Sequence, residues 1–148
     1  METNDKIYLE IREILAKNKD AEKGFDQAAN NAESPDLKTY FANKSRERRI
    51  FNQKLISEIK IAYSDFDETG SFSGTIHRAW MDVKALFSGS DDESMLAEAI
   101  RGDKAAIKEY EDVLHYKKLP AGLHFLLSEQ REKIQMDLKK NQDFNEVN

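Results

Sequence analysis

The residues best suited to metal chemistry in this sequence are its three histidines and its many carboxylates. A helical site for a pair of iron or manganese ions needs Glu-x-x-His on each of two helices, because that spacing places carboxylate and imidazole on one helix face. None of the histidines, His77, His115 and His124, has a glutamate three residues before it. The nearest match is Asp112 with His115, at the predicted end of a helix, where a histidine favours the helix dipole without any metal. The standard ligand set is therefore absent.

Carboxylates alone supply a second hypothesis for a metal site, because oxygen ligands can hold iron or manganese without histidine. The candidate ligands are Asp20, Glu47, Glu98 and Asp103. This set would belong to a divergent carboxylate-based oxidase or an iron-handling protein. The sequence has no cysteine, which excludes thiolate metal sites, iron–sulfur clusters, disulfides and cysteine nucleophiles.

Polar residues on the predicted core stripes form another group of candidates, Asn18, Lys44, Arg48, Asp103 and Gln130. Buried polar groups need partners. Counting outward from the turn at Ser34 puts Asp20 level with Arg48, which predicts an ion pair across the hairpin. In one interpretation these side chains form an altered polar site inside a bundle. In the other, they reach the edge of the bundle or form structural pairs.

Two long amphipathic helices are expected to position the candidate residues in the first half of the chain, from Asn18 to Arg48. Apolar residues at three- and four-residue spacing predict one helix over about residues 4–32 and another over about 36–66. Between them, Ser34, Pro35 and Asp36 are typical of an N-cap, a first-turn proline and an acid that favours the helix dipole. Long helices joined by so short a turn form an antiparallel hairpin.

The second half of the chain predicts a similar hairpin after a long connection. Helices are expected over about residues 91–116 and 120–141, with a capping box of Ser90 and Glu93 and a fraying tail after Asn141. The connection over residues 67–90 contains a short apolar helix over about 74–87. A connection of this length can travel the whole bundle, as one does in ferritin-like bundles. The predicted fold class is all-α, a ferritin-like four-helix bundle of two long hairpins with a long crossover that contains a short extra helix.

Length, charge and composition limit the number of domains and the kinds of partner that the chain can have. The chain of 148 residues suits one domain, predicted over residues 1–148, and its formal net charge is −5. The densest basic run, residues 46–49, is broken by Glu47, so no nucleic-acid partner is expected. We expect a cytoplasmic protein without a membrane partner, because no signal segment is visible and no apolar run approaches the ~20 residues of a membrane span.

The most distinctive stretch, residues 70–84, places the only tryptophan beside histidine and arginine. Its sequence GSFSGTIHRAWMDVK, together with EAIRGD at residues 98–103 and Tyr110, resembles a bacterial ferritin-like four-helix-bundle family of unknown function. That family's pattern looks like G-S-x-x-G-x-x-H-R-x-W-x-D-x-K followed by E-x-x-R-G-E. Asp20 with Gly24 and Phe25 is similar to its first-helix element D-x-x-x-G-[FY]. The resemblance spans nearly the whole chain and is strongest over residues 70–110.

The resemblance implies the ferritin-like fold, and it implies iron or manganese as the cofactor that such relatives often bind. It also marks residues that could bind a ligand, namely His77, Arg78, Trp80, Asp82, Lys84, Tyr110 and Gln130. The chain departs from the pattern at Asp103, where the family usually has glutamate, and it lacks near residues 137–139 a His-Asp pair common in the family. A structural interpretation of His77 to Trp80 is a crossover helix docked by its tryptophan, with histidine and arginine bonding loop carbonyls.

Two classes of function remain. The missing ligands and the helical architecture favour a non-enzymatic, self-associating protein, an interaction or stress-related bundle. We expect a dimer, the commonest assembly, and an unknown protein partner is a further option. The alternative is the carboxylate-based metal-binding oxidase or iron-handling protein, with iron or manganese bound inside the bundle. Stoichiometric metal would separate the two.

Overall fold

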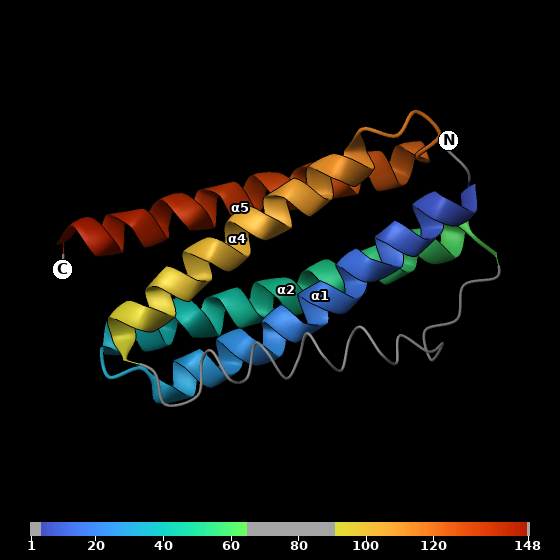
Figure 1. The fold of residues 1–148 in the computed structure, drawn as a ribbon. Helices are drawn as coiled ribbons and strands as arrows, with labels where there is room; N and C mark the ends of the chain where they lie inside the picture. The colour runs from blue at the N-terminus through green and yellow to red at the C-terminus, as the bar shows by residue number, and fades with distance from the viewer. Residues whose placement is uncertain (1–3, 65–90, 148) are drawn as a thin grey trace.

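The computed structural model describes residues 4–64 and 91–147, which form a bundle of four helices (Figure 1). They are α1 (Asn4–Asn31), α2 (Pro35–Ala62), α4 (Asp92–Leu114) and α5 (Ala121–Val147). These ranges contain no strand, so the predicted all-α four-helix bundle is confirmed. No helix within them is long and apolar enough to cross a membrane. The predicted short helix over residues 74–87 lies outside the described residues.

Each half of the chain forms one antiparallel hairpin, in which α1 packs along α2 and α4 packs along α5. The first turn is built as predicted. Ser34 is the N-cap of α2, its hydroxyl accepts a hydrogen bond from the N–H of Leu37, and Pro35 opens the helix. Such a cap satisfies one of the N–H groups that a helix start leaves without an intrahelical partner.

The two hairpins are joined so that α2 and α4 run in the same direction (Figure 1). Asp92, at the start of α4, accepts hydrogen bonds from the backbone N–H groups of Glu33 and Ser34 at 2.9 and 3.0 Å. The starts of α4 and α2 therefore lie side by side, whereas α2 ends at the opposite end of the bundle. The end of α2 and the start of α4 therefore lie at opposite ends of the bundle, as the predicted long crossover requires, and the connection itself lies outside the described residues.

The ends of two helices on either side of this crossover differ from the prediction. α2 ends at Ala62 instead of about residue 66, and the N–H of Tyr63 donates to the carbonyl of Ile59. α4 is capped by Asp91, whose carboxylate accepts a hydrogen bond from the N–H of Ser94 at 2.8 Å. The predicted cap at Ser90 was wrong by one residue, because an ionised carboxylate accepts more strongly than a hydroxyl.

The C-terminal helix is longer than predicted. Fraying was expected after Asn141, yet α5 continues to Val147. Asn141 is completely buried, and its amide nitrogen donates to the carbonyl of Leu96 at 3.3 Å. This contact anchors α5 to the start of α4, so the helix continues beyond the point at which the apolar pattern stops.

The apolar core is divided into two clusters along the bundle axis. The larger one includes Ile7, Ile11, Phe51, Leu55, Ile59, Val113, Leu123 and Leu127. The smaller one includes Phe25, Ala28, Leu37, Phe41, Met95, Leu96 and Ala99. On α1, α2 and α4, polar residues occupy the buried positions between the two clusters. The bundle therefore has a layer of buried polar residues inside its core, which includes Asn18, Lys44, Arg48 and Asp103 and is called the polar layer below.

Candidate functional site

Asp103 of α4 lies at the centre of the polar layer and is completely buried. One of its oxygens, Oδ2, contacts Lys44 Nζ at 2.6 Å, and the other, Oδ1, contacts Arg48 Nη2 at 2.8 Å. Lys44 and Arg48 are four residues apart on α2, which places both on one helix face, and both are buried in the bundle interior. One carboxylate thus binds two buried cations, each through a charge-assisted hydrogen bond.

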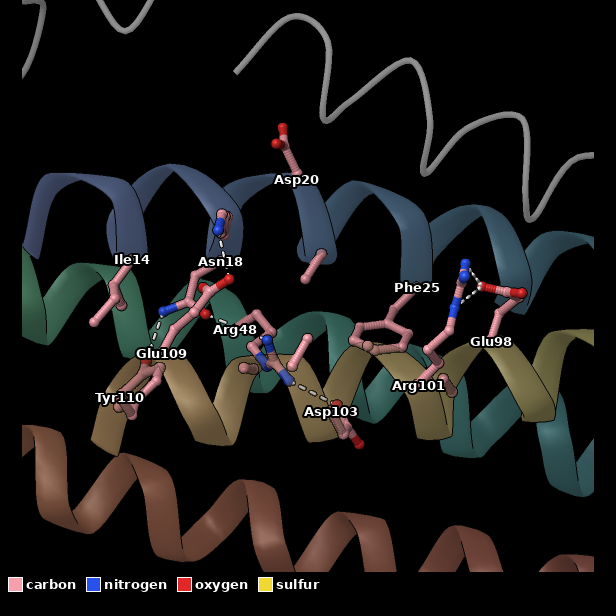
Figure 2. Close-up of a pocket in the computed structure, with 16 residues that line it drawn as sticks. Ile14, Asn18, Asp20, Phe25, Arg48, Glu98, Arg101, Asp103, Glu109 and Tyr110 are labelled. Carbon is pink, nitrogen blue, oxygen red and sulfur yellow. Dashed lines mark hydrogen bonds and ion pairs between the residues drawn. The ribbon is translucent and has the colours of Figure 1, made fainter. Parts of the chain in front are cut away.

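A chain of hydrogen bonds continues from Arg48 across the bundle (Figure 2). Arg48 Nη1 donates to the amide oxygen of Asn18 at 3.3 Å, and Asn18 Nδ2 donates to the hydroxyl oxygen of Tyr110 at 2.8 Å. The Tyr110 hydroxyl donates to Gln130 Oε1 at 2.8 Å, and Gln130 Nε2 donates to the carbonyl of Phe51 at 3.0 Å. Burial raises the pKa of Tyr110 to about 12, so its hydroxyl keeps its proton at neutral pH. The chain connects all four helices.

Lys44 makes further contacts that hold its ammonium group in the core. Its Nζ lies 3.6 Å from an oxygen of Asp137 on α5, and 4.7 Å from the centre of the Phe25 ring. It also lies 5.6 Å from the centre of the Tyr40 ring. The Tyr40 hydroxyl donates to the backbone carbonyl of Asp137 at 3.0 Å, which fixes α5 against α2. Cation–π contacts strengthen when the cation is desolvated, as it is here.

Glu47 brings a third carboxyl group to this layer. Burial raises its pKa to about 8, and a hydrogen bond to Asp137 together with the charge of Asp137 acts in the same direction. Lys44 and Arg48 oppose the shift. At neutral pH Glu47 therefore keeps its proton and hydrogen-bonds Asp137. The charges then balance, because Asp103 and Asp137 face the two cations.

The polar residues that the sequence placed on core stripes are all buried, and they share this one layer. They are Asn18, Lys44, Arg48, Asp103 and Gln130. The interpretation in which they reach the edge of the bundle is wrong, because each is held by partners from another helix. They form an interior polar site made of structural pairs.

The predicted ion pair between Asp20 and Arg48 is wrong. Figure 2 shows Asp20 pointing away from Arg48, which instead pairs with Asp103 and Asn18. Asp20 follows Asn18 by two residues, which turns its side chain by about 200° around α1. Burial raises the pKa of Asp20 to about 6, although Lys23 and Lys19 act against the shift.

The four carboxylates proposed as metal ligands lie in different surroundings. Glu98 forms an ion pair with Arg101 on the same helix, Asp103 binds the two cations, and Glu47 hydrogen-bonds Asp137. The Asp20 side chain points away from Arg48 and Asp103. Within residues 4–64 and 91–147, no group of three or more His, Cys, Asp or Glu side chains could hold a metal ion.

The histidines that the structure describes lie away from the polar layer. His115 is the exposed C-cap of α4, and its N–H donates to the carbonyl of Glu111. His124 is exposed on α5. The remaining family-pattern residues, His77, Arg78, Trp80, Asp82 and Lys84, lie outside the described residues.

Two members of the polar layer were missed, Asp137 and Tyr40. Asp137 follows Gln130 by seven residues, which puts both on one face of α5. That spacing was the signal that could have found Asp137. Tyr40 carried no such signal, because a tyrosine on a core stripe is ordinarily read as an apolar side chain.

A cleft of about 470 Å³ lies between α1 and α4 and reaches the polar layer from one side (Figure 2). Among the described residues, its lining comes from these two helices and from Arg48 of α2. The residues are Ile14, Lys17, Asn18, Asp20, Ala21, Phe25, Arg48, Glu98, Ala99, Arg101, Gly102, Asp103, Ala105, Ala106, Glu109 and Tyr110. Seven of these side chains are apolar or small and seven are charged, and the polar layer forms the floor.

Comparison with known proteins gives a family without an assigned activity. No curated protein matches the chain. Residues 6–116, which are well over half of the sequence and include α2, α4 and most of α1, match the family described as a domain of unknown function, DUF2383. These residues contribute Asn18, Lys44, Arg48, Asp103 and Tyr110 to the polar layer. The chain belongs to the family of the domain of unknown function DUF2383.

Proposed function

We propose that this protein is a non-enzymatic bundle of the ferritin-like kind, which acts by binding and self-association. One observation carries the proposal. Lys44 and Arg48 occupy the middle of the bundle, where carboxylate bundles with metal-based activity hold their ions. Asp103 and Asp137, which could otherwise face a metal, already face these two cations.

The electrostatic consequence is unfavourable for a divalent ion. Two unit charges of the same sign about 4 Å apart repel by about 4 kcal/mol at an effective dielectric constant of about 20. A divalent ion near Asp103 would meet two such charges, and it would have to displace hydrogen bonds of 2.6 and 2.8 Å. The protein's own cations therefore take the place of the metal.

Metal content tests this proposal. Protein purified without a metal-chelating tag is loaded anaerobically with iron(II), and separately with manganese(II), and then analysed by mass spectrometry. We expect only substoichiometric metal. About two tightly held ions per chain, the content of a carboxylate bundle with a metal pair, would contradict the proposal.

A double variant sharpens the test. Lys44→Met with Arg48→Met leaves Asp103 and Asp137 without their cations. If the two cations exclude metal, this variant binds more iron(II) than the wild type does. Arg101→Met is the matched control, because Arg101 is an exposed cation whose ion pair within the described residues is with Glu98 of its own helix. Equal metal content in all three proteins would count against charge exclusion.

Self-association is supported by large apolar side chains on the outer surface. Ile61 is 78% exposed near the end of α2, and Phe125 is 72% exposed near the start of α5. Sedimentation velocity is expected to show a dimer, and Phe125→Glu is expected to weaken it. Gln135→Glu, an exposed position further along α5, is the control for added charge. A wild-type protein that stays monomeric at high concentration would refute this part of the proposal.

A further inference from the structure

The seam between α1 and α4 is the loosest in the bundle. α1 packs closely along α2, and α4 along α5, whereas α1 and α4 touch at few places. The cleft of about 470 Å³ lies in this seam, and its size falls within the ~300–1,000 Å³ of ordinary small-molecule pockets.

Small side chains on α4 keep the cleft open. Ala99, Gly102, Ala105 and Ala106 form that wall, and a Cβ added at Gly102 would meet no atom within 4 Å. The opposite wall, on α1, has Ile14, Ala21 and Phe25 as its apolar residues, between polar ones. An apolar body of modest size can therefore lie along the seam.

Six of the seven charged side chains in the described lining are paired with one another. Lys17 of α1 forms an ion pair with Glu109 of α4, and Arg101 forms one with Glu98. In the floor, Arg48 is bound to Asp103. Burying an ion without a counter-charge is costly, and these paired groups offer no counter-charge to a ligand.

One lining charge lacks such a pair, and the floor offers one weakly held polar group. Asp20 has no hydrogen-bond partner for either oxygen among the residues that the structure describes, but its carboxylate points away from the floor (Figure 2). The bond from Arg48 to the Asn18 oxygen is long, at 3.3 Å. A hydroxyl or carbonyl group can therefore bind beside Asn18 without disturbing the pair of Arg48 with Asp103.

We propose that the cleft between α1 and α4 is a binding site for an uncharged, mostly apolar small molecule that carries one hydroxyl or carbonyl group. The site rests on the proposed function in one respect, that the bundle binds and does not catalyse. The ligand would be recognised by the apolar residues of the two walls and by the polar floor at Asn18. The paired charges around the cleft disfavour a cationic or anionic ligand.

Three matched probes test this assignment, namely naphthalenemethanol, naphthylmethylamine and naphthoate. They share one aromatic body and are neutral, cationic and anionic at neutral pH. Binding to the full chain is measured by titration calorimetry. We expect the alcohol to bind about tenfold or more tightly than either ion, the ratio expected when an ion is desolvated without a partner.

Two variants block the cleft, and one is the control. Gly102→Trp and Ala105→Trp each place an indole in the cleft and are expected to abolish binding of the alcohol. Circular dichroism verifies that each variant remains folded. Ala97→Trp, at an exposed position of α4 outside the cleft, is expected to bind the alcohol as the wild type does.

Several results would overturn the assignment. These are the absence of alcohol binding at millimolar concentration, unchanged binding in both folded blocking variants, or binding of an ion as tight as that of the alcohol. Tighter binding of the amine that disappears in Asp20→Asn would show a cation site instead. None of these results changes the metal content, so failure of the cleft is distinguishable from failure of the proposed function.

Discussion

Replacing Asp103 with asparagine removes the carboxylate that pairs with both Lys44 and Arg48 but keeps the shape of the side chain. Among hydrogen-bonding and ionic partners in the described residues, Lys44 then retains Asp137 at 3.6 Å, and Arg48 retains the bond of 3.3 Å to Asn18. Removing one partner of a buried ion pair costs about 3–5 kcal/mol, because the other charge stays buried without compensation. We expect a loss of that size, or a fall in Tm of about 6–20 °C.

Urea denaturation followed by far-ultraviolet circular dichroism measures the loss directly. The matched control is Asp112→Asn, because Asp112 is exposed on the same helix and lies 3.7 Å from Lys108. That change should cost about 0.5 kcal/mol or less. A cost below about 1 kcal/mol for Asp103→Asn would refute the reasoning, since it is smaller than the ordinary penalty for an unsatisfied buried group.

A quadruple replacement separates the ion pairs from the space they fill. Changing Asp103 to leucine, Asp137 to asparagine, and both Lys44 and Arg48 to methionine removes the two cations together with the two anions that balance them, at similar volume. Exchange of a buried ion network for uncharged side chains is often neutral or stabilising by about 1–4 kcal/mol. The quadruple variant should therefore be far more stable than Asp103→Asn. If both were equally destabilised, packing rather than charge would explain the single variant.

Three further predictions concern individual residues. The raised pKa of Glu47, about 8 against an ordinary 4.5, means that the folded chain keeps a proton which the unfolded chain loses, so stability falls as pH rises from 4.5 to 8. After a discount for partial exposure, the loss between pH 6 and 8 should be about 1–2 kcal/mol, and Glu47→Gln should flatten it in denaturation curves measured across this range. Tyr110→Phe leaves Asn18 and Gln130 without their shared partner and should cost about 1–3 kcal/mol by urea denaturation; an unchanged midpoint would contradict the hydrogen-bond chain. Gly102→Ala adds a Cβ that meets nothing within 4 Å, so it should raise stability by about 0.5–1 kcal/mol in thermal melts, and a lower Tm would show that the α4 wall is not open.

Much of the fold follows from local signals. The helix over about residues 36–66 was expected from its apolar spacing and from Ser34 and Pro35, and α2 begins at Pro35. Helix ends were less accurate where the structure uses distant contacts. Asn141 is the clearest case, because its partner Leu96 lies on another helix, 45 residues earlier in the chain.

In the polar layer, too, the buried positions follow from local spacing, whereas the pairing of the residues depends on contacts between helices. Periodicity alone placed Asn18, Lys44 and Arg48 on buried stripes, because a side chain's position around its own helix depends only on the 3.6-residue turn. The pairing of these residues was not available from that pattern. Asp20 was matched with Arg48 by level along the hairpin, but its direction around α1 turned it away.

The sequence by itself therefore determined the described helices, their apolar faces and the presence of polar groups in the core. Only the tertiary structure decided that Asp103 binds both cations, that Asp137 and Glu47 complete the layer, and that a cleft opens between α1 and α4. The physical reason is that these contacts join residues from different helices. Their meeting depends on how the helices are rotated and aligned by packing, which no local spacing encodes.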